Sequence, residues 1–106
     1  MARALIHVPA TARRGEVIEI KTLISHVMET GYRIGVTGKP IPRDIIERFV
    51  CTYNGEEIFS AKLSPAIAAN PYITFFTVVT ESGTLTFSWT DQHGATQVQT
   101  AEIKVE

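Results

Sequence analysis

Residues 45–61, IIERFVCTYNGEEIFSA, contain two alternating segments of apolar and polar residues that meet at Asn54-Gly55. An Asn-Gly pair between such segments is a strong β-hairpin signal, because a two-residue type I′ turn needs positive φ at both central positions. We therefore expect the fold to be built around this hairpin.

The first face of the hairpin has the character of a protein core. Side chains alternate across a strand, so Phe49, Cys51 and Tyr53 share one apolar face. A two-residue turn also predicts that Cys51 lies opposite Ile58.

The second face carries an unexpected apolar pair, because the same register places Val50 opposite Phe59. An antiparallel sheet usually shows polar residues on its solvent side. Something is therefore expected to cover this face, either another protein or a loop of the same chain.

Five more segments have the pattern of strands, at residues 4–8, 16–24, 72–80, 84–90 and 96–105. Segment 72–80 is apolar on both faces, as in a strand buried on both sides. The apolar residues of the last segment change phase between Val98 and Ala101, which predicts a bulge or a strand that bends. Together these patterns predict an all-β, immunoglobulin-like, two-sheet antiparallel sandwich of about seven strands, with a small barrel as the alternative.

Alternation also predicts the inward faces of two strands: Ile18, Ile20, Thr22 and Ile24 in one, and Leu85, Phe87 and Trp89 in the other. Between the hairpin and residue 71, Ser64 as N-cap followed by Pro65 predicts one short helical turn.

Residues 25–44 contain three glycines and two prolines, which break helix and strand periodicity. Loops of this length are uncommon inside compact domains and are generally functional or disordered. Met28, Tyr32 and Ile34 make the segment more apolar than a disordered linker. We predict an ordered, functional loop with a small ribbon in its middle.

The chain has 106 residues, 44% hydrophobic content and a formal net charge of -1, which fits one domain over residues 1–106. It has no basic field for nucleic acid and no polybasic patch for anionic lipid, so neither nucleic acid nor membrane is an expected partner. The sequence shows neither an apolar run of membrane-spanning length nor a signal-peptide pattern. A single cysteine cannot form an intramolecular disulfide, so cysteine usage leaves the compartment open.

No residue pattern indicates a catalytic, cofactor or metal site. Cys51 lies mid-strand on the apolar face, where a thiol pKa rises, so we interpret it as a buried structural thiol. His7, His26 and His93 lack the spacing of zinc ligands. His26 begins the long loop, where it is expected to bond to loop backbone or to orient Met28.

Three long strings carry a family resemblance: GEVIEIKTLISHVMETGYR, GKPIPRDIIERFVCTYNGEEIFSAKLSPAIAANPY and ESGTLTFSWTDQHGA. They resemble the Z subunit of the SoxYZ carrier complex of sulfur-oxidising bacteria, from about Val8 through nearly the whole chain. The family commonly has proline between the histidine and methionine of the SHxMETG string, where Val27 stands here. This departure concerns the rigidity of the loop.

The resemblance implies an immunoglobulin-like sandwich that pairs tightly with a SoxY-type sulfur-carrier subunit, as a heterodimer or as a higher-order assembly of such heterodimers. In that family the carrier ends in a Gly-Gly-Cys-Gly-Gly arm whose cysteine holds sulfur intermediates during thiosulfate oxidation. The present chain ends in AEIKVE, so the resemblance implies a non-catalytic subunit that holds the carrier and helps dock the complex to Sox enzymes. It also implies a periplasmic location, reached without a signal peptide of its own by export with the carrier.

Residues and resemblance together predict a partner interface that includes Met28, Tyr32, Arg33, Val50 and Phe59, with segment 72–80 adding apolar surface. One alternative is that loop 25–44 folds over the Val50 face within the same chain.

Two alternatives belong to other functional classes. One is a thiol-dependent sulfur carrier or enzyme that uses Cys51 with His26 as its base. The other is a generic sandwich module of a larger secreted enzyme, which would share the fold but not the three strings.

Overall fold

The computed structural model describes residues 3–64, 67 and 69–106, and no helix occurs within these ranges. The strands are β1 (Ala4–His7), β2 (Thr11–Ala12), β3 (Val17–Ile24), β4 (Ile46–Tyr53), β5 (Glu56–Lys62), β6 (Tyr72–Val78), β7 (Gly83–Asp91) and β8 (Thr96–Val105). They form a three-stranded sheet, in the order β1-β3-β6, and a five-stranded sheet, in the order β2-β8-β7-β4-β5. A membrane-spanning helix is accordingly not found in the described part of the chain.

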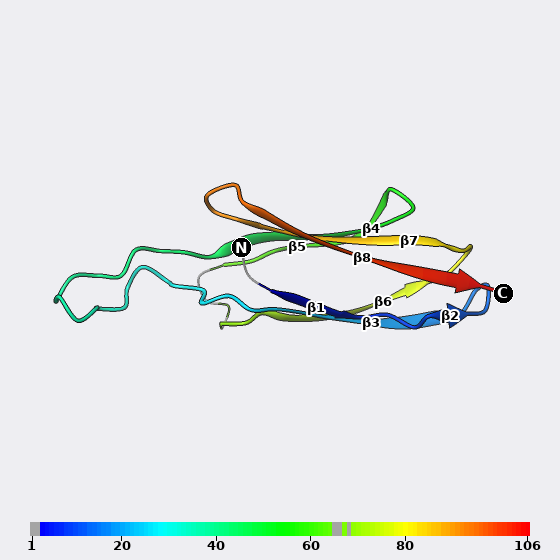
Figure 1. Cartoon of the computed structure of the whole chain (residues 1–106), viewed down its shortest axis with the longest axis horizontal. Helices are drawn as coiled ribbons and strands as arrows, with labels where there is room; N and C mark the ends of the chain where they lie inside the picture. Colours follow the sequence, from blue (N-terminus) through cyan, green and yellow to red (C-terminus); the bar gives the residue numbers. More distant parts are fainter. Residues whose placement is uncertain (1–2, 65–66, 68) are drawn as a thin grey trace.

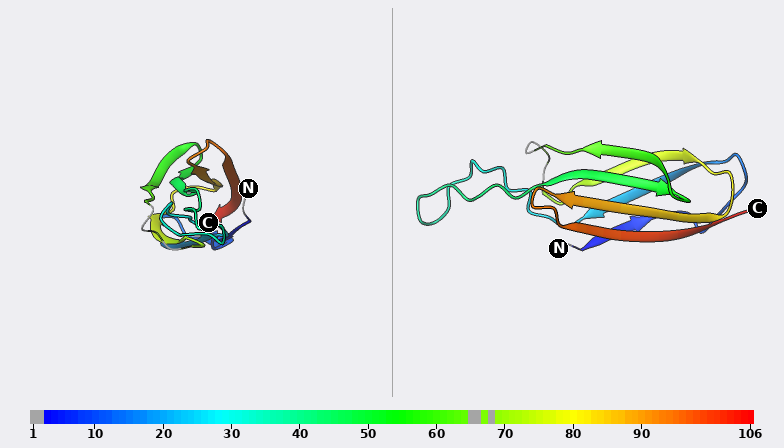
Figure 2. Two further views of the ribbon diagram at one scale, coloured as in Figure 1. Left: turned by 90° about the vertical axis from the view of Figure 1, so that its left-hand side faces the viewer. Right: turned by 90° about the horizontal axis from the view of Figure 1, so that it is seen from above.

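The two sheets lie face to face with the core between them (Figures 1 and 2). The molecule is elongated, 58 × 20 × 19 Å, and residues 25–44 project from one end of the sandwich (Figure 1). This architecture confirms the predicted all-β sandwich. It adds an eighth strand, the two-residue β2, which pairs with β8 in parallel rather than antiparallel fashion.

The alternation of β3 and β7 builds the core as predicted, with Ile18, Ile20, Thr22 and Ile24 buried from one sheet and Leu85, Phe87 and Trp89 from the other. Phe49 lies at the centre, its ring centroid 5.2 Å from Trp89 and 6.1 Å from Phe75 of the opposite sheet. The buried Thr22 hydroxyl donates to the Ile73 carbonyl at 2.9 Å, so this polar group has a partner inside the core.

The central hairpin has the predicted turn but an irregular register. Asn54 and Gly55 have φ values of 51° and 86°, the positive angles that a type I′ turn requires. The pairing of β4 with β5 shifts between Cys51 and Thr52, so Cys51 lies opposite Phe59 rather than its predicted neighbour. Such a shift is a β-bulge, in which one strand contributes an extra residue.

The bulge reverses the predicted orientation of Phe59. Ile58 is the extra residue, and Val50 consequently pairs with Ser60. Phe59 turns to the inner face, where its ring stacks on Phe75 with a centroid distance of 4.4 Å. The predicted apolar pair of Val50 and Phe59 on an outer face is therefore wrong.

Two other strand predictions also need correction. The register of β8 with β7 is continuous from Thr96 to Ile103, so the bulge expected after Val98 is not there. Val98 is instead an exposed residue on the outer face. β6 is covered on one side only, because Phe75 points into the core while Phe76 is exposed.

The loops agree in part with the sequence. The helical turn predicted after Ser64 depends on Pro65, which lies outside the described residues. Residues 25–44 do contain a small ribbon, formed by bridges between Glu29 and Asp44 and between Ile34 and Pro40. The ribbon extends away from the sandwich instead of folding over its outer face (Figure 1).

Candidate binding surface

The outer face of the three-stranded sheet, here called the three-stranded face, gathers exposed apolar side chains. Across β3 and β6 its rows are Leu23 beside Tyr72, Lys21 beside Thr74, Glu19 beside Phe76, and Val17 beside Val78; β1 adds Leu5 beside Leu23 and His7 beside Lys21. Leu5, Val17, Tyr72, Phe76 and Val78 are each at least half exposed. Both the first and the last row of the face are therefore apolar.

Exposure of this face costs free energy in water. Phe76 is 63% exposed, and full burial of a side chain of this size is typically worth about 1.5–3 kcal/mol. Lys21 and Glu19 form an ion pair at 3.4 Å in the middle rows. A contiguous exposed apolar patch on a small protein generally marks an interaction site.

The outer face of the five-stranded sheet is more polar. Val50 lies there, half-buried, with Ser60 of β5 and Ser88 of β7 as its strand neighbours. Val98 is 52% exposed on the same face, where it pairs with Ser88. Isolated valines among serine and threonine residues are ordinary for a solvated sheet, so this face is the weaker candidate.

Residues 25–44, here called the arm, are anchored at their base. Met28 is buried, and the Ile46 N–H donates to its Sδ at 3.3 Å. The Met28 N–H donates to Nδ1 of His26 at 3.0 Å, which confirms the expected bond between His26 and loop backbone. Met28 has φ 49°, an uncommon angle outside glycine, so these contacts hold a specific backbone conformation.

Backbone hydrogen bonds continue along the arm. The Gly35 N–H donates to the Lys39 carbonyl at 2.9 Å, and the Ile41 N–H donates to the Arg33 carbonyl at 2.7 Å. Gly31 has φ 93°, and a Cβ there would approach Cβ of Arg43 to 3.3 Å. The two halves of the arm thus lie close together as a ribbon.

An ion pair supports the same ribbon from the side. Nη2 of Arg33 lies 2.5 Å from Oε1 of Glu29. The hydrogen bond and the charge of Arg33 lower the pKa of Glu29, and the same contact raises the pKa of Arg33.

The tip of the arm is apolar and cationic. Tyr32 is 86% exposed, Val36 is fully exposed, and Ile34 is more than half exposed. Residues 30–43 contain three lysine or arginine residues and no acidic one; Arg33 pairs with Glu29 and Arg43 with Glu47, so the positive charge at the tip comes from Lys39. An ordered segment that presents such side chains to water has the character of a docking element.

Cys51 is fully buried in β4, as predicted. Its strand neighbours are Phe59 and Phe87, and its thiol approaches the Thr52 carbonyl at 3.9 Å. Burial raises the pKa of Cys51 to about 12, so the thiol form dominates at neutral pH.

His26, the base in the thiol hypothesis, has other contacts. Besides the Met28 backbone, it faces Asp44, with Nε2 3.6 Å from Oδ1. Nε2 of His93 lies 4.0 Å from the same oxygen. Among the residues that the structure describes, no group of three histidine, cysteine or acidic side chains is placed to hold a metal ion.

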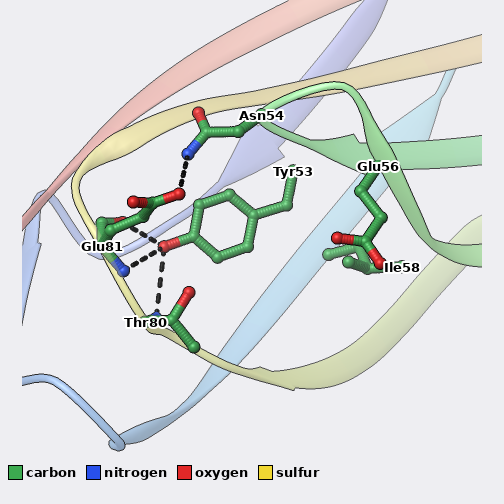
Figure 3. A pocket seen from close by; sticks show the side chains of 6 residues that line it. All are labelled: Tyr53, Asn54, Glu56, Ile58, Thr80 and Glu81. Atoms are coloured by element: carbon green, nitrogen blue, oxygen red, sulfur yellow. Dashed lines mark hydrogen bonds between the residues drawn. The ribbon is translucent and has the colours of Figure 1, made fainter.

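A small hollow beside the hairpin turn is structural in character. Figure 3 shows its lining residues, Tyr53, Asn54, Glu56, Ile58, Thr80 and Glu81. The Tyr53 hydroxyl accepts from the N–H groups of Thr80 and Glu81, at 3.3 and 3.1 Å, and donates to the Glu81 carbonyl. These bonds fasten the β6–β7 connection to the end of β4.

The five predicted interface residues do not form one surface. Met28 and Phe59 pack inward, Tyr32 and Arg33 lie on the arm, and Val50 lies on the polar outer face. Sequence reasoning found the apolar excess of segment 72–80 but not the contribution of β1 and β3. The outward positions of Val17 and Leu23 in the alternation of β3 were the available signal.

Solved structures with the same fold come from several proteins. A superoxide reductase (neelaredoxin) from Ignicoccus hospitalis aligns with a TM-score of 0.71 and 16% identity, over 99% of this chain and 82% of that chain. The sulfur carrier protein SoxY from Chlorobium limicola f thiosulfatophilum aligns with a TM-score of 0.67 and 13% identity, over 97% of this chain and 78% of that chain. At these identities the likeness shows the fold alone. Among curated proteins, none matches the sequence.

The sequence itself matches one family over residues 6–102, nearly its whole length, and that family is described as sulphur oxidation protein SoxZ. The match confirms the resemblance carried by the three long strings. The chain therefore belongs to the SoxZ family.

Proposed function

We propose that this chain is a non-catalytic subunit that holds a SoxY-type sulfur carrier on its three-stranded face. The observation that carries the proposal is the row of exposed apolar side chains on β3 and β6, of which Phe76 and Tyr72 are the largest. Membership of the SoxZ family supports a role in sulfur oxidation.

The accessibility and the pKa of the cysteine thiols indicate which subunit carries out the covalent sulfur chemistry. A carrier cysteine must reach several enzymes and react as a thiolate, whereas Cys51 is fully buried and has a pKa of about 12. We assign the covalent sulfur chemistry to the glycine-flanked terminal cysteine of the carrier subunit. The present chain supplies binding and positioning.

A second role is assigned to the arm. Its apolar, cationic tip points along the long axis, away from the sandwich (Figure 1), while the three-stranded face lies along the side of the molecule. We propose that the arm docks the complex to a Sox enzyme with an acidic rim around an apolar groove, because such a surface complements the arm in charge and polarity.

The family resemblance also supports a periplasmic location, with export of this chain in complex with the carrier. Osmotic-shock fractionation of host cells tests this proposal. The chain should enter the periplasmic fraction when the carrier is present and stay in the cytoplasm when the carrier gene is deleted; release without the carrier would contradict it.

The test of carrier binding uses two matched exposed residues. Phe76→Asp places a charge on the three-stranded face and should reduce carrier binding by at least roughly tenfold, since a desolvated charge is costly in an apolar interface. Val98→Asp places the same charge on the opposite outer face and should leave binding unchanged. Isothermal titration of each variant with the purified carrier subunit measures both affinities.

Because both side chains are exposed, circular dichroism should show that both variants fold. Equal carrier affinity of the Phe76→Asp variant and the wild type would contradict the proposed face. A loss of affinity in the Val98→Asp variant would point to the five-stranded sheet instead.

A further inference from the structure

The three-stranded face is complementary to a second copy of itself. Its four rows across β3 and β6 run apolar, cationic, anionic and apolar: Leu23 with Tyr72, Lys21 with Thr74, Glu19 with Phe76, and Val17 with Val78. A two-fold axis in the plane of contact, perpendicular to the strands and between the two middle rows, exchanges the first row with the fourth and the second with the third. The two apolar rows then meet each other, Lys21 on β3 meets Glu19, and Phe76 on β6 meets Thr74.

The charges are the discriminating part of this arrangement. With the axis perpendicular to the strands, Lys21 of each copy faces Glu19 of the other, which gives two reciprocal opposite-charge contacts. An axis parallel to the strands would instead place Glu19 over Phe76 and Lys21 over Thr74. Under that axis Lys21 and Glu19 would keep only their own ion pair, and burial of a charge pair that gains no further partners is costly, so the perpendicular axis is favoured.

The apolar rows agree with the same axis. Leu23 of one copy faces Val17 of the other, and Tyr72 faces Val78, so the half-buried Leu23 and the exposed Val17, Tyr72 and Val78 all meet apolar positions. This isologous contact, in which one patch meets its own copy, is typical of two-fold dimers.

We propose that, in the absence of the carrier subunit, two copies of this chain pair face to face through their three-stranded faces. The carrier subunit then displaces the second copy from the same face, a step that rests on the proposed function above. The SoxY carrier of Chlorobium limicola f thiosulfatophilum shares the fold of this chain. A carrier of that fold has a sheet of the same architecture with which to replace the second copy.

The area of the three-stranded face limits the affinity that we expect between the two copies. The seven residues of β6 extend over roughly 24 Å, and three strands span about 14 Å. This patch is smaller than a standard stable interface, so we expect a reversible dimer with a dissociation constant of about 10 µM or weaker.

The experiment is sedimentation velocity of the isolated full chain from about 1 to 500 µM, a range chosen around that dissociation constant. The wild type should move from monomer to dimer across this range. Lys21→Glu and Glu19→Lys should each weaken the dimer by at least roughly tenfold, because like charges then face each other twice.

Mixing the two single variants supplies the decisive control. A Lys21→Glu copy and a Glu19→Lys copy restore two opposite-charge contacts across the interface, so an equimolar mixture should form a mixed dimer with nearly wild-type strength. A wild type that stays monomeric at the highest concentration, or single variants that dimerise as well as the wild type, would overturn the proposal.

Adding purified carrier subunit separates this proposal from the proposed function. Conversion of the dimer into a one-to-one complex with the carrier supports both. If the chain is monomeric and still binds the carrier, the self-pairing proposal is wrong and the proposed function stands. A carrier that binds without dissociating the dimer overturns the shared face.

Discussion

Cys51 lies in β4 between Phe59 and Phe87 of the neighbouring strands, in a part of the core from which water is excluded. Desolvation disfavours the charged thiolate and raises the pKa of Cys51 to about 12. A cysteine in the unfolded chain ionises near pH 8.5. The two states therefore bind different numbers of protons in alkaline solution.

This difference predicts how stability depends on pH. Above about pH 8.5 the unfolded chain loses the Cys51 proton while the folded chain keeps it, so the unfolded state binds fewer protons and is favoured as pH rises towards the folded pKa. The contribution of the thiol to stability should be complete below pH 8.5 and should fall between about pH 8.5 and 12.

Urea unfolding of the wild type and of Cys51→Ala from pH 7 to 10 measures this contribution. The alanine variant should be less stable at pH 7, because it leaves a small cavity, and the difference between the two proteins should narrow as pH rises. A constant difference, or rapid labelling of native Cys51 by a thiol reagent at pH 7, would contradict the buried-thiol assignment.

At the scale of elements, the arm is an ordered segment that the packing of the sandwich does not require. Met28 and His26 fix its base, and backbone hydrogen bonds at Gly35 and Ile41 close the ribbon. Its tip side chains nevertheless face water. Rigid presentation of apolar groups reduces the entropy lost when a partner binds.

The arm predicts a separation of functions. The double variant Tyr32→Ser, Val36→Ser should keep carrier affinity and should keep stability within about 0.5 kcal/mol, because its side chains are exposed. It should slow thiosulfate oxidation in a system reconstituted from the carrier complex and purified Sox enzymes. Val98→Ser is the matched control, with an exposed valine removed from the sandwich.

Two results would contradict the docking role of the arm. Unchanged thiosulfate turnover in the double variant would show that the tip contacts no enzyme that matters to the rate. Loss of carrier affinity would instead place the arm in the carrier interface.

The strands themselves could largely be predicted from the sequence, because period-two alternation records which side of a sheet is buried. This held for Ile20 in β3 and for Phe87 in β7. The register of the central hairpin could not be predicted in the same way. The bulge at Ile58 moves Phe59 to the other face, and alternation carries no mark of an inserted residue.

At the scale of the whole molecule, the binding surface depends on strand order, which alternation does not encode. Phe76 and Val17 are separated along the chain but belong to the same outer face, because β6 pairs with β3. Because alternation does not show which strands are neighbours, the apolar residues on both faces of segment 72–80 predicted a strand buried on both sides within this chain. Among the residues that the structure describes, none covers the outer side of β6, where Phe76 is exposed, and we propose that the carrier subunit does.

Hydroxyl-radical footprinting of the purified chain at about 1 µM, where the proposed self-pairing leaves it monomeric, tests this assignment most directly when oxidation is compared with and without the carrier subunit. Mass spectrometry reports oxidation of individual side chains, and exposed aromatic residues are sensitive positions. Tyr72 and Phe76 on the three-stranded face, and Tyr32 on the arm tip, are exposed in the single chain. We predict that the carrier protects Tyr72 and Phe76 while Tyr32 stays reactive. Unchanged oxidation of Tyr72 and Phe76 in a complex that has demonstrably formed would contradict it.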